Sequence, residues 1–287
     1  VVGKYEIPAG NDIITYGYGW GAGTWGSVPW GLGSSSPIEL PQRDWWFDNF
    51  DNDLVMNIRN GAIYYWQRGA ESDIDTSLAT RAVLLSSLAG AESVPQSAMQ
   101  ILVSQNDKHL LAFGAVPYGS TSTADFDPLL IRWASQDAPE FWTPGTVIVP
   151  STGNLSSAGF IRVSRGSAIV RALPTRQTTL VWTNSHLYSL QYTGTTEVFN
   201  LQEMADNISI MGPRAVASAN NITYWMGTDK FYAFAGTVET LPCTLRNHVF
   251  NNINYNQKLQ VISGTNESFH EIWWFYCTED SEQIDSY

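Results

Sequence analysis

Short apolar runs, many of them alternating with polar residues, recur along the chain from residue 44 onward. They are rich in β-branched and aromatic residues and are separated by turn residues, a pattern typical of half-buried strands. Twelve runs stand out: DLVMNI (53–58), GAIYYWQ (61–67), MQILVS (99–104), HLLAFGA (109–115), LLIRWAS (129–135), GSAIVRAL (166–173), TLVWT (179–183), HLYSLQY (186–192), ITYWMG (222–227), KFYAFAG (230–236), LQVISG (259–264) and EIWWFYC (271–277). The pattern predicts an all-β fold with little helix.

Residues that favour tight turns join several of these runs in pairs. They tolerate a positive φ or cap the backbone locally, so the pairs are predicted to be hairpins. The turn candidates are Arg59-Asn60-Gly61, Asn106-Asp107, Asn184-Ser185, Thr228-Asp229 and Thr265-Asn266. Helical spacing occurs only in residues 75–93, where Leu78, Ala82 and Leu85 would share one side, and it predicts either a short helix or an irregular insertion.

Five related aromatic segments suggest a repeat. IYYW, LAFG, LVWT, ITYW and IWWF begin at residues 63, 111, 180, 222 and 272. Three of the four intervals fall near the 40–50 residues of a β-propeller blade, and the interval of 69 is long enough for an insertion or an extra irregular blade. The repeat predicts a β-propeller-like domain of four-stranded antiparallel blades. An unrelated β-sandwich with aromatic strands is the alternative.

Composition points to a subunit of an assembly. Charged residues make up 15% of the 287 residues, whereas about 25% is usual for soluble domains, so partners are expected to cover part of the surface. The formal net charge of −12 argues against a nucleic-acid binder, because binding a phosphate backbone requires clustered cations. An acidic surface would instead repel DNA that has to pass without adhering.

Glycine alternates with aromatic residues between residues 16 and 33. In an extended chain Tyr16, Tyr18 and Trp20 would share one face and leave glycine on the other, while Trp25 and Trp30 add further anchors. We expect this segment to be an assembly arm that grips a neighbouring subunit; a flexible linker is the alternative. The polar stretch SSSPIELPQ follows it. The predicted organisation is an arm and linker over residues 1–43 and a β domain over residues 44–287; a β domain that is incomplete at its C-terminal end is the alternative.

No pattern of catalytic, cofactor-binding or metal-binding residues emerges. His109, His186, His248 and His270 lack the spacing of metal ligands, and Cys243 and Cys277 are expected to be reduced core residues. Carboxylates that could serve glycoside hydrolysis are present, but sequence does not give the distance between them; they are Asp48, Asp51, Asp53, Asp125, Asp127 and Glu140. No run is long and apolar enough to predict a membrane span. We expect no enzyme and no cofactor.

One chemical motif is suggestive. SQDAPEFW places Ser135, Asp137 and Trp142 at the spacing of the Asp box of sialidase propellers, although Pro139 and Phe141 replace the usual glycine and threonine. In that family the box is a structural turn, in which Ser and Asp cap backbone groups and Trp packs between strands. The motif therefore predicts architecture and not catalysis.

Several longer segments together resemble the tail nozzle proteins of short-tailed bacteriophages, also called tail tubular protein B or stabilisation proteins. The resemblance covers most of the chain and rests on YGYGWGAGTWG (16–26), WWFDNFDNDLVMNIRNGAIYYWQ (45–67), ILVSQNDKHLLAFGA (101–115), IRWASQDAPEFWTP (131–144), LVWTNSHLYSLQYTG (180–194), ITYWMGTDKFYAFAGTVETLPC (222–243) and FHEIWWFY (269–276). The chain is shorter than typical members, and the continuation expected after its final strand is absent from this sequence.

The resemblance implies a structural virion protein, assembled in the bacterial host cytoplasm as a sixfold homo-oligomeric ring. Such a ring extends the DNA-ejection channel below the portal and adaptor, contacts other tail or fibre proteins, and lets the genome through its lumen without specific binding. Two other functions stay open from the sequence: a secreted glycan-binding or sialidase-like propeller, and a cellular propeller scaffold. A glycan reader would need exposed aromatics in a concave pocket, whereas a ring subunit would place them at intersubunit seams.

Overall fold

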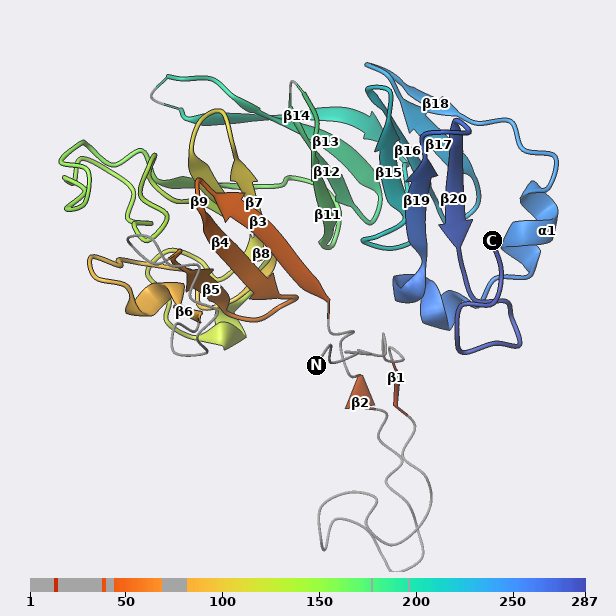
Figure 1. Cartoon of the computed structure of the whole chain (residues 1–287), viewed down its shortest axis with the longest axis horizontal. Coiled ribbons are helices and arrows are strands. Elements are labelled where there is room, and N and C mark those ends of the chain that lie inside the picture. The colour runs from red at the N-terminus through yellow and green to blue at the C-terminus, as the bar shows by residue number, and fades with distance from the viewer. Residues whose placement is uncertain (1–12, 15–37, 40–43, 69–81, 177, 196) are drawn as a thin grey trace, which may run out of the picture.

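A computed structural model of the chain describes residues 13–14, 38–39, 44–68, 82–176, 178–195 and 197–287. Strands dominate these residues (Figure 1). The helical elements are short: α1 (Arg246–Asn251) and the 3-10 turns Leu85–Ser87, Thr123–Asp125 and Tyr255–Gln260. No helix within the described ranges is long and apolar enough to cross a membrane. The prediction of an all-β fold is confirmed.

Four antiparallel sheets of four strands follow one another along the chain, each with its strands in sequence order. The first contains β3 (Trp45–Phe50), β4 (Asp53–Ile58), β5 (Ile63–Trp66) and β6 (Val83–Leu84). The second contains β7 (Ala98–Ser104), β8 (His109–Ala115), β9 (Asp127–Trp133) and β10 (Gly159–Arg162). The third contains β11 (Ile169–Pro174), β12 (Thr179–Thr183), β13 (His186–Tyr192) and β14 (Phe199–Asp206).

The fourth sheet contains β15 (Val216–Ala219), β16 (Ile222–Met226), β17 (Phe231–Phe234) and β18 (Val238–Thr240). A fifth sheet has two strands, β19 (Ile262–Asn266) and β20 (Glu271–Phe275). A separate two-residue ladder joins β1 (Ile13–Ile14) to β2 (Ile38–Glu39). Each four-stranded sheet is a meander built from one stretch of sequence, as a blade-like repeat requires.

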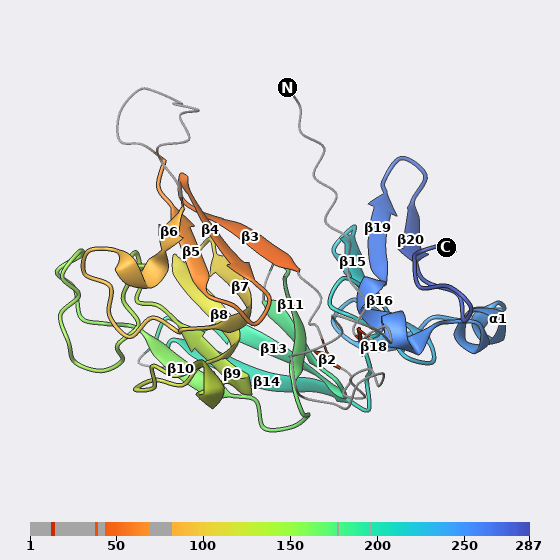
Figure 2. The same cartoon turned by 90° about the horizontal axis from the view of Figure 1, so that it is seen from below.

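Sheets that follow one another in sequence pack face to face (Figure 2). Buried side chains of the first and second sheets, such as Val55 and Ile101, form one apolar cluster. A second cluster joins the second and third sheets and includes Phe113 and Val181. A third extends from the third sheet through the fourth to the fifth, with Trp182 and Trp225 in edge-to-face contact at 5.4 Å between ring centroids. The core is thus a series of layers between consecutive sheets.

Each of the twelve predicted runs overlaps a strand, and four of them match the strand bounds residue for residue. The predicted turns lie between strands at residues 59–61, 106–107, 184–185 and 228–229, but Thr265 and Asn266 belong to β19 and the turn occupies residues 267–270. The helical interpretation of residues 75–93 is wrong where the structure describes them, because residues 82–93 contain β6 and a 3-10 turn.

The predicted repeat is in register for four of its five segments. LAFG, LVWT, ITYW and IWWF all lie in the second strand of their sheets, whereas IYYW is the third strand of the first sheet. The interval of 69 residues contains an insertion, since residues 134–158 separate β9 from β10. The alternative of an extra irregular blade in this interval is therefore not needed.

Candidate functional site

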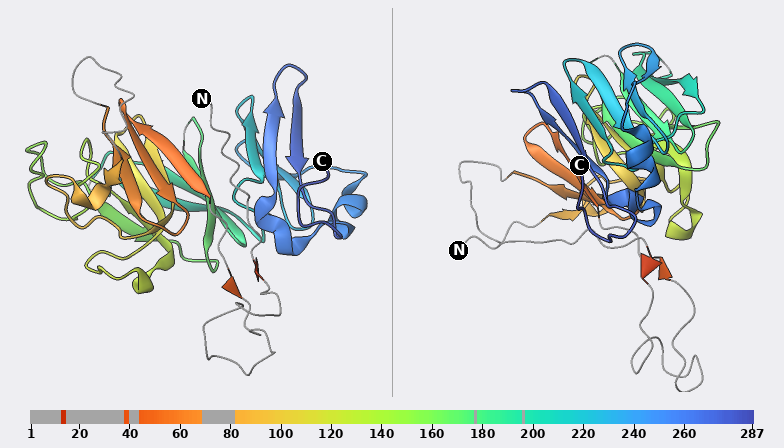
Figure 3. Two further views of the ribbon diagram at one scale, coloured as in Figure 1. Left: turned by 60° about the horizontal axis from the view of Figure 1, so that its bottom comes forward. Right: turned by 90° about the vertical axis from the view of Figure 1, so that its right-hand side faces the viewer.

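The outer edge of the fifth sheet is the first candidate site. β20 pairs with β19, and no other strand of the described chain pairs along its opposite edge. Past the end of β20, Tyr276 exchanges backbone hydrogen bonds with Ser286, which brings Tyr287 beside the sheet. Figure 3 shows the C-terminus close to β20. An edge of this kind leaves backbone donors and acceptors available to another segment.

Stacked aromatic rings cover the outward face of β20. The ring of Trp273 stacks on Tyr287 at 4.8 Å and on Phe275 at 6.3 Å between centroids. Because side chains alternate along a strand, Trp274 points the other way, where it contacts Phe231 of the fourth sheet. Tyr287 is 77% exposed. An apolar surface of this kind is typical of an interaction site.

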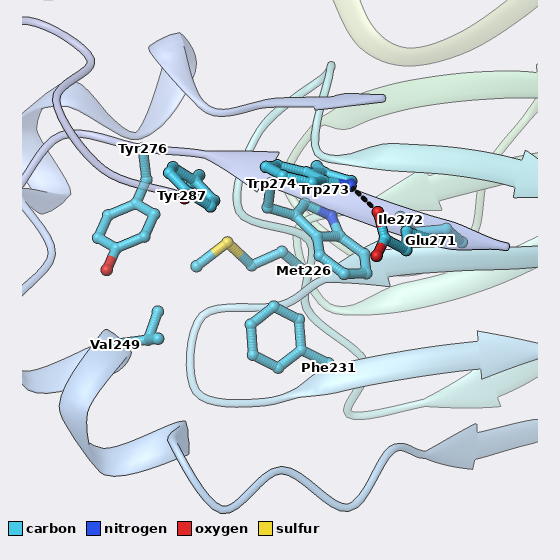
Figure 4. A pocket seen from close by; sticks show the side chains of 9 residues that line it. All are labelled: Met226, Phe231, Val249, Glu271, Ile272, Trp273, Trp274, Tyr276 and Tyr287. Carbon is cyan, nitrogen blue, oxygen red and sulfur yellow. Dashed lines mark hydrogen bonds between the residues drawn. The ribbon is translucent and has the colours of Figure 1, made fainter. Parts of the chain in front are cut away.

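A pocket of about 290 Å³ opens beside these rings (Figure 4). Its lining residues come from the fourth sheet, from α1, from β20 and from the C-terminal segment after β20; they are Met226, Phe231, Val249, Glu271, Ile272, Trp273, Trp274, Tyr276 and Tyr287. The indole nitrogen of Trp273 donates to Oε2 of Glu271 at 3.0 Å, which fixes the carboxylate at the rim. The pocket is apolar, and its size suits an inserted side chain better than a cofactor.

The outward face of the first sheet also carries stacked aromatic side chains. Trp45 and Phe47 lie two residues apart on β3, with their rings nearly parallel and 6.0 Å apart. Phe47 is 60% exposed. The opposite face of the same strand packs on the second sheet, where Oδ2 of Asp48 accepts a hydrogen bond from the Val103 amide at 2.7 Å. Both ends of the sheet series therefore present aromatic side chains to the outside.

Three charged residues meet around one indole where the sheets converge. The guanidinium of Arg171, on β11, lies 4.2 Å above the ring of Trp46, and that of Arg214 lies 5.4 Å from the same ring. Arg214 pairs with Asp44, the residue before β3. Burial, and secondarily the charge of Arg214, lower the pKa of Arg171 to about 10. This cluster joins the first, third and fourth sheets and has a structural function.

The Asp-box-like turn is part of the core of the second sheet. Trp142 is 1% exposed and donates from its indole nitrogen to the Pro139 carbonyl at 2.7 Å. The Ser135 hydroxyl accepts a hydrogen bond from the Ser157 amide at 3.1 Å. Asp137 contributes through its backbone, which has a φ of 55°, and its carboxylate makes no hydrogen bond to the described residues. The three residues lie in and beside a turn, and Asp137 takes part in it through its backbone and without the side-chain cap that the motif implies.

The carboxylates weighed as catalytic candidates are occupied by structural contacts. Asp53 accepts from the Tyr65 hydroxyl and from the Arg68 amide. Asp127 pairs with Arg162, and this pairing lowers its pKa against the effect of burial. Glu140 accepts from the Ser151 hydroxyl at 2.6 Å. Within the described ranges no group of three His, Cys, Asp or Glu side chains could hold a metal ion.

The sequence analysis did not predict that the outward faces of β3 and β20 are two aromatic surfaces at opposite ends of the sheet series. The aromatic runs WWF (45–47) and IWWF (272–275) were the sequence signals that could have indicated them. The predicted arm residues Tyr16, Tyr18, Trp20, Trp25 and Trp30 lie outside the described residues. The ladder between β1 and β2 is part of the described structure. It pairs Ile14 with Ile38, so the chain before residues 16–33 lies beside the chain after them.

Comparison with known proteins identifies no family for this chain. No protein-family model matches the chain, and no curated protein matches it.

Proposed function

We propose that the chain is a structural subunit of a bacteriophage tail, assembled as a ring that extends the DNA-ejection channel. In this proposal the five sheets are consecutive blades of a β-propeller. The first strands of neighbouring sheets lie side by side for β3 with β7, β7 with β11 and β15 with β19, as inner strands around an axis would. The proposal includes the sixfold symmetry and the virion location that the sequence resemblance implies.

The observation that carries the proposal is the pair of aromatic end faces. One end carries the exposed Phe47 stacked on the half-buried Trp45. The other end carries the exposed Tyr287, with Trp273 and Phe275 half-buried beside it, on a chain with few charges. Fully burying one such ring against a neighbour contributes about 1.5–3 kcal/mol, so the rings at each seam would supply part of the free energy of assembly. Aromatic residues of this kind dominate the central contacts of interfaces.

The charge of the chain supports passage of DNA through the ring. A hexamer would carry six times the net charge of −12. Part of this charge on the lumen would repel the phosphate backbone and keep the genome from adhering. The function is mechanical and requires no catalytic group.

The native mass of the purified protein tests the proposal. We expect a hexameric mass and ring-shaped particles in electron micrographs. Phe47→Ser should shift the mass toward the monomer, because it removes an aromatic ring from the seam. Phe160→Ser is the matched control: Phe160 is 52% exposed on β10, the outer strand of the second sheet, which forms neither end face, so its loss should leave assembly unchanged. A protein that stays monomeric at all concentrations would contradict the ring.

A glycan-binding or sialidase-like propeller is the second candidate. The aromatic walls of the pocket in Figure 4 favour it, since sugar rings stack on such side chains. A monomeric native mass together with turnover of a glycan would favour this function over the ring.

A further inference from the structure

A second cavity lies between the fourth and fifth sheets, on the side of their hairpin turns. Its volume is about 470 Å³, within the range of small-molecule sites. It shares Glu271, Ile272 and Trp274 with the pocket of Figure 4. Its other residues come from the end of β15 and the β15–β16 turn, from β16, from Leu241 after β18, and from residues 265–270 around the β19–β20 turn. It is therefore a distinct chamber with its own lining.

Two turns with fixed backbone shape border this cavity. Asn220 and Asn221 have φ values of 52° and 64° and connect Ala219 to Ile222, which are paired across the hairpin. Two consecutive positive φ values are typical of a type I′ turn, which matches the twist of the strands. His270 has a φ of 55° where the second turn meets β20. The side chains on these turns are thus presented from rigid supports.

The polar side chains of the lining have unused hydrogen-bonding capacity. Asn220, Asn266, Glu267 and His270 make no side-chain hydrogen bond to the part of the chain that the structure describes. Glu271 is held through Oε2 by the indole of Trp273, which leaves Oε1 for a ligand. These groups offer both donors and acceptors around one space.

Two half-buried aromatic side chains form the apolar part of the cavity. Tyr224 comes from β16 and Trp274 from β20, so the two sheets each supply one ring. The indole nitrogen of Trp274 donates to the Ala215 carbonyl at 3.0 Å, which holds this ring in place. The fixed indole of Trp274, together with the ring of Tyr224, supplies apolar ring faces beside the polar rim.

We propose that this cavity binds a neutral saccharide residue. A sugar has an apolar ring face for Tyr224 or Trp274 and hydroxyl groups for the amides and carboxylates of the rim. The described lining contains no lysine or arginine, and it contains Glu267 and Glu271, so phosphates, nucleotides and acidic sugars are disfavoured. The site goes beyond the proposed function and does not depend on ring formation.

Saturation-transfer NMR of the full chain with methyl glycosides tests the site. The probes are the methyl glycosides of glucose, galactose, mannose and N-acetylglucosamine, with methyl glucuronide as the acidic comparison. We expect signal transfer to at least one neutral glycoside and weaker transfer to the glucuronide. No transfer to any neutral probe, or a preference for the glucuronide, would overturn the proposal. The native mass of the same sample reports separately on the ring.

Two glycine substitutions locate the binding site. Asn220→Gly removes a lining amide while keeping the positive φ that the turn needs, and it should weaken binding roughly fivefold to tenfold, as loss of one or two hydrogen bonds does. Asn221→Gly is the control, because Asn221 shares the turn and the positive φ but does not line this cavity. Equal affinities of the two variants would overturn the assignment. Glu267→Gln should keep neutral binding and reduce discrimination against the glucuronide.

Discussion

Arg214 and Asp44 form an ion pair across 170 residues of sequence: Nε and Nη2 of Arg214 donate to Oδ1 of Asp44 at 2.8 and 2.5 Å. Asp44 precedes the first sheet and Arg214 precedes the fourth, so the pair connects sheets that the chain itself does not join directly. The carboxylate is 5% exposed, and the guanidinium is 44% exposed and lies near the ring of Trp46.

Removal of this guanidinium is expected to destabilise the fold. Arg214→Ala leaves a buried carboxylate without its partner, at a cost of about 1–3 kcal/mol in the free energy of unfolding. Arg214→Lys should recover part of the loss, since a lysine keeps the charge but not the two donors in a fork. Denaturant unfolding of both variants, of Asp44→Asn and of the double mutants measures the coupling. Strictly additive effects would show that the contact does not stabilise the protein.

Lowering the pH should reduce the folding stability of the protein because of the buried His109. Nδ1 donates to the Ala134 carbonyl at 2.8 Å, Nε2 is buried without a partner among the described residues, and Tyr192 and Phe199 surround the ring. Burial lowers the pKa of His109, and the Ala134 hydrogen bond, Asp107 and Asp137 offset this only partly. The unfolded chain therefore takes up a proton near pH 6.5 before the folded one does, so stability is full above this pH and falls below it.

The melting temperature at pH 7 and pH 5 tests this dependence. His109→Gln keeps a donor for the Ala134 carbonyl and removes the titration, so its melting temperature should change less between the two pH values than that of the wild type. His248→Gln is the control, because His248 is exposed on α1. The same pH sensitivity in all three proteins would exclude His109 as the cause.

The backbone of Asp137 should matter more than its carboxylate. Because its φ is 55°, glycine fits this position without strain, whereas alanine does not. We expect Asp137→Ala to be about 1 kcal/mol less stable than Asp137→Gly. The order is measured by thermal and denaturant unfolding. A higher stability of Asp137→Ala than of Asp137→Gly would show that the positive φ of this residue does not determine the stability of the turn.

Deletion of residues 16–33 is expected to abolish ring assembly while the β domain stays folded. The deleted segment contains the five predicted aromatic anchors, and the first four-stranded sheet begins only at Trp45. Native mass and melting temperature are measured together on the deleted and intact proteins. A variant of full length with serine at Tyr16, Tyr18, Trp20, Trp25 and Trp30 controls for chain length. Unchanged assembly in both variants would leave the arm without support.

The two cysteines should differ in reactivity. Cys277 is 1% exposed, and burial, with a smaller effect of Asp285, raises the pKa of its thiol to about 11. Cys243 is half-buried. Because the thiolate is the reactive form, iodoacetamide should modify Cys243 first at neutral pH, as followed by peptide mass analysis. Equal rates would mean that the region around Cys277 opens readily.

Strand prediction found the apolar central strands and missed several outer or short ones, including the aromatic first strand β3 (WWFDNF). β14 (FNLQEMAD) is an outer strand with mostly exposed side chains, and β15 (VASA) is short and made of small residues, so neither has the apolar signal of a central strand. The helix α1 is too short for a periodic pattern to show. The repeat was recognised from second strands, and the third strand IYYW matched it because it has the same aromatic composition.

The candidate sites could be predicted only in part, because their residues come from separate sheets. Trp273 and Phe275 were visible as a β-branched and aromatic run, but their outward direction depends on which face of β20 packs on the fourth sheet. Arg171 and Arg214 are isolated in the sequence and meet only at Trp46. The saccharide cavity depends on two turns almost fifty residues apart, Asn220 and residues 267–270, and nothing local in the sequence relates them.

The layered core also determines the order in which the chain can fold during translation. Each sheet is made from one stretch of sequence and packs against sheets next to it in the chain, so contacts between sheets form between segments that leave the ribosome one after the other. Short loops close before long ones at lower entropic cost. Asp44 is synthesised before the first sheet, whereas Arg214 is synthesised after the third. The carboxylate of Asp44 can therefore form its ion pair only after the segments of three complete sheets have left the ribosome.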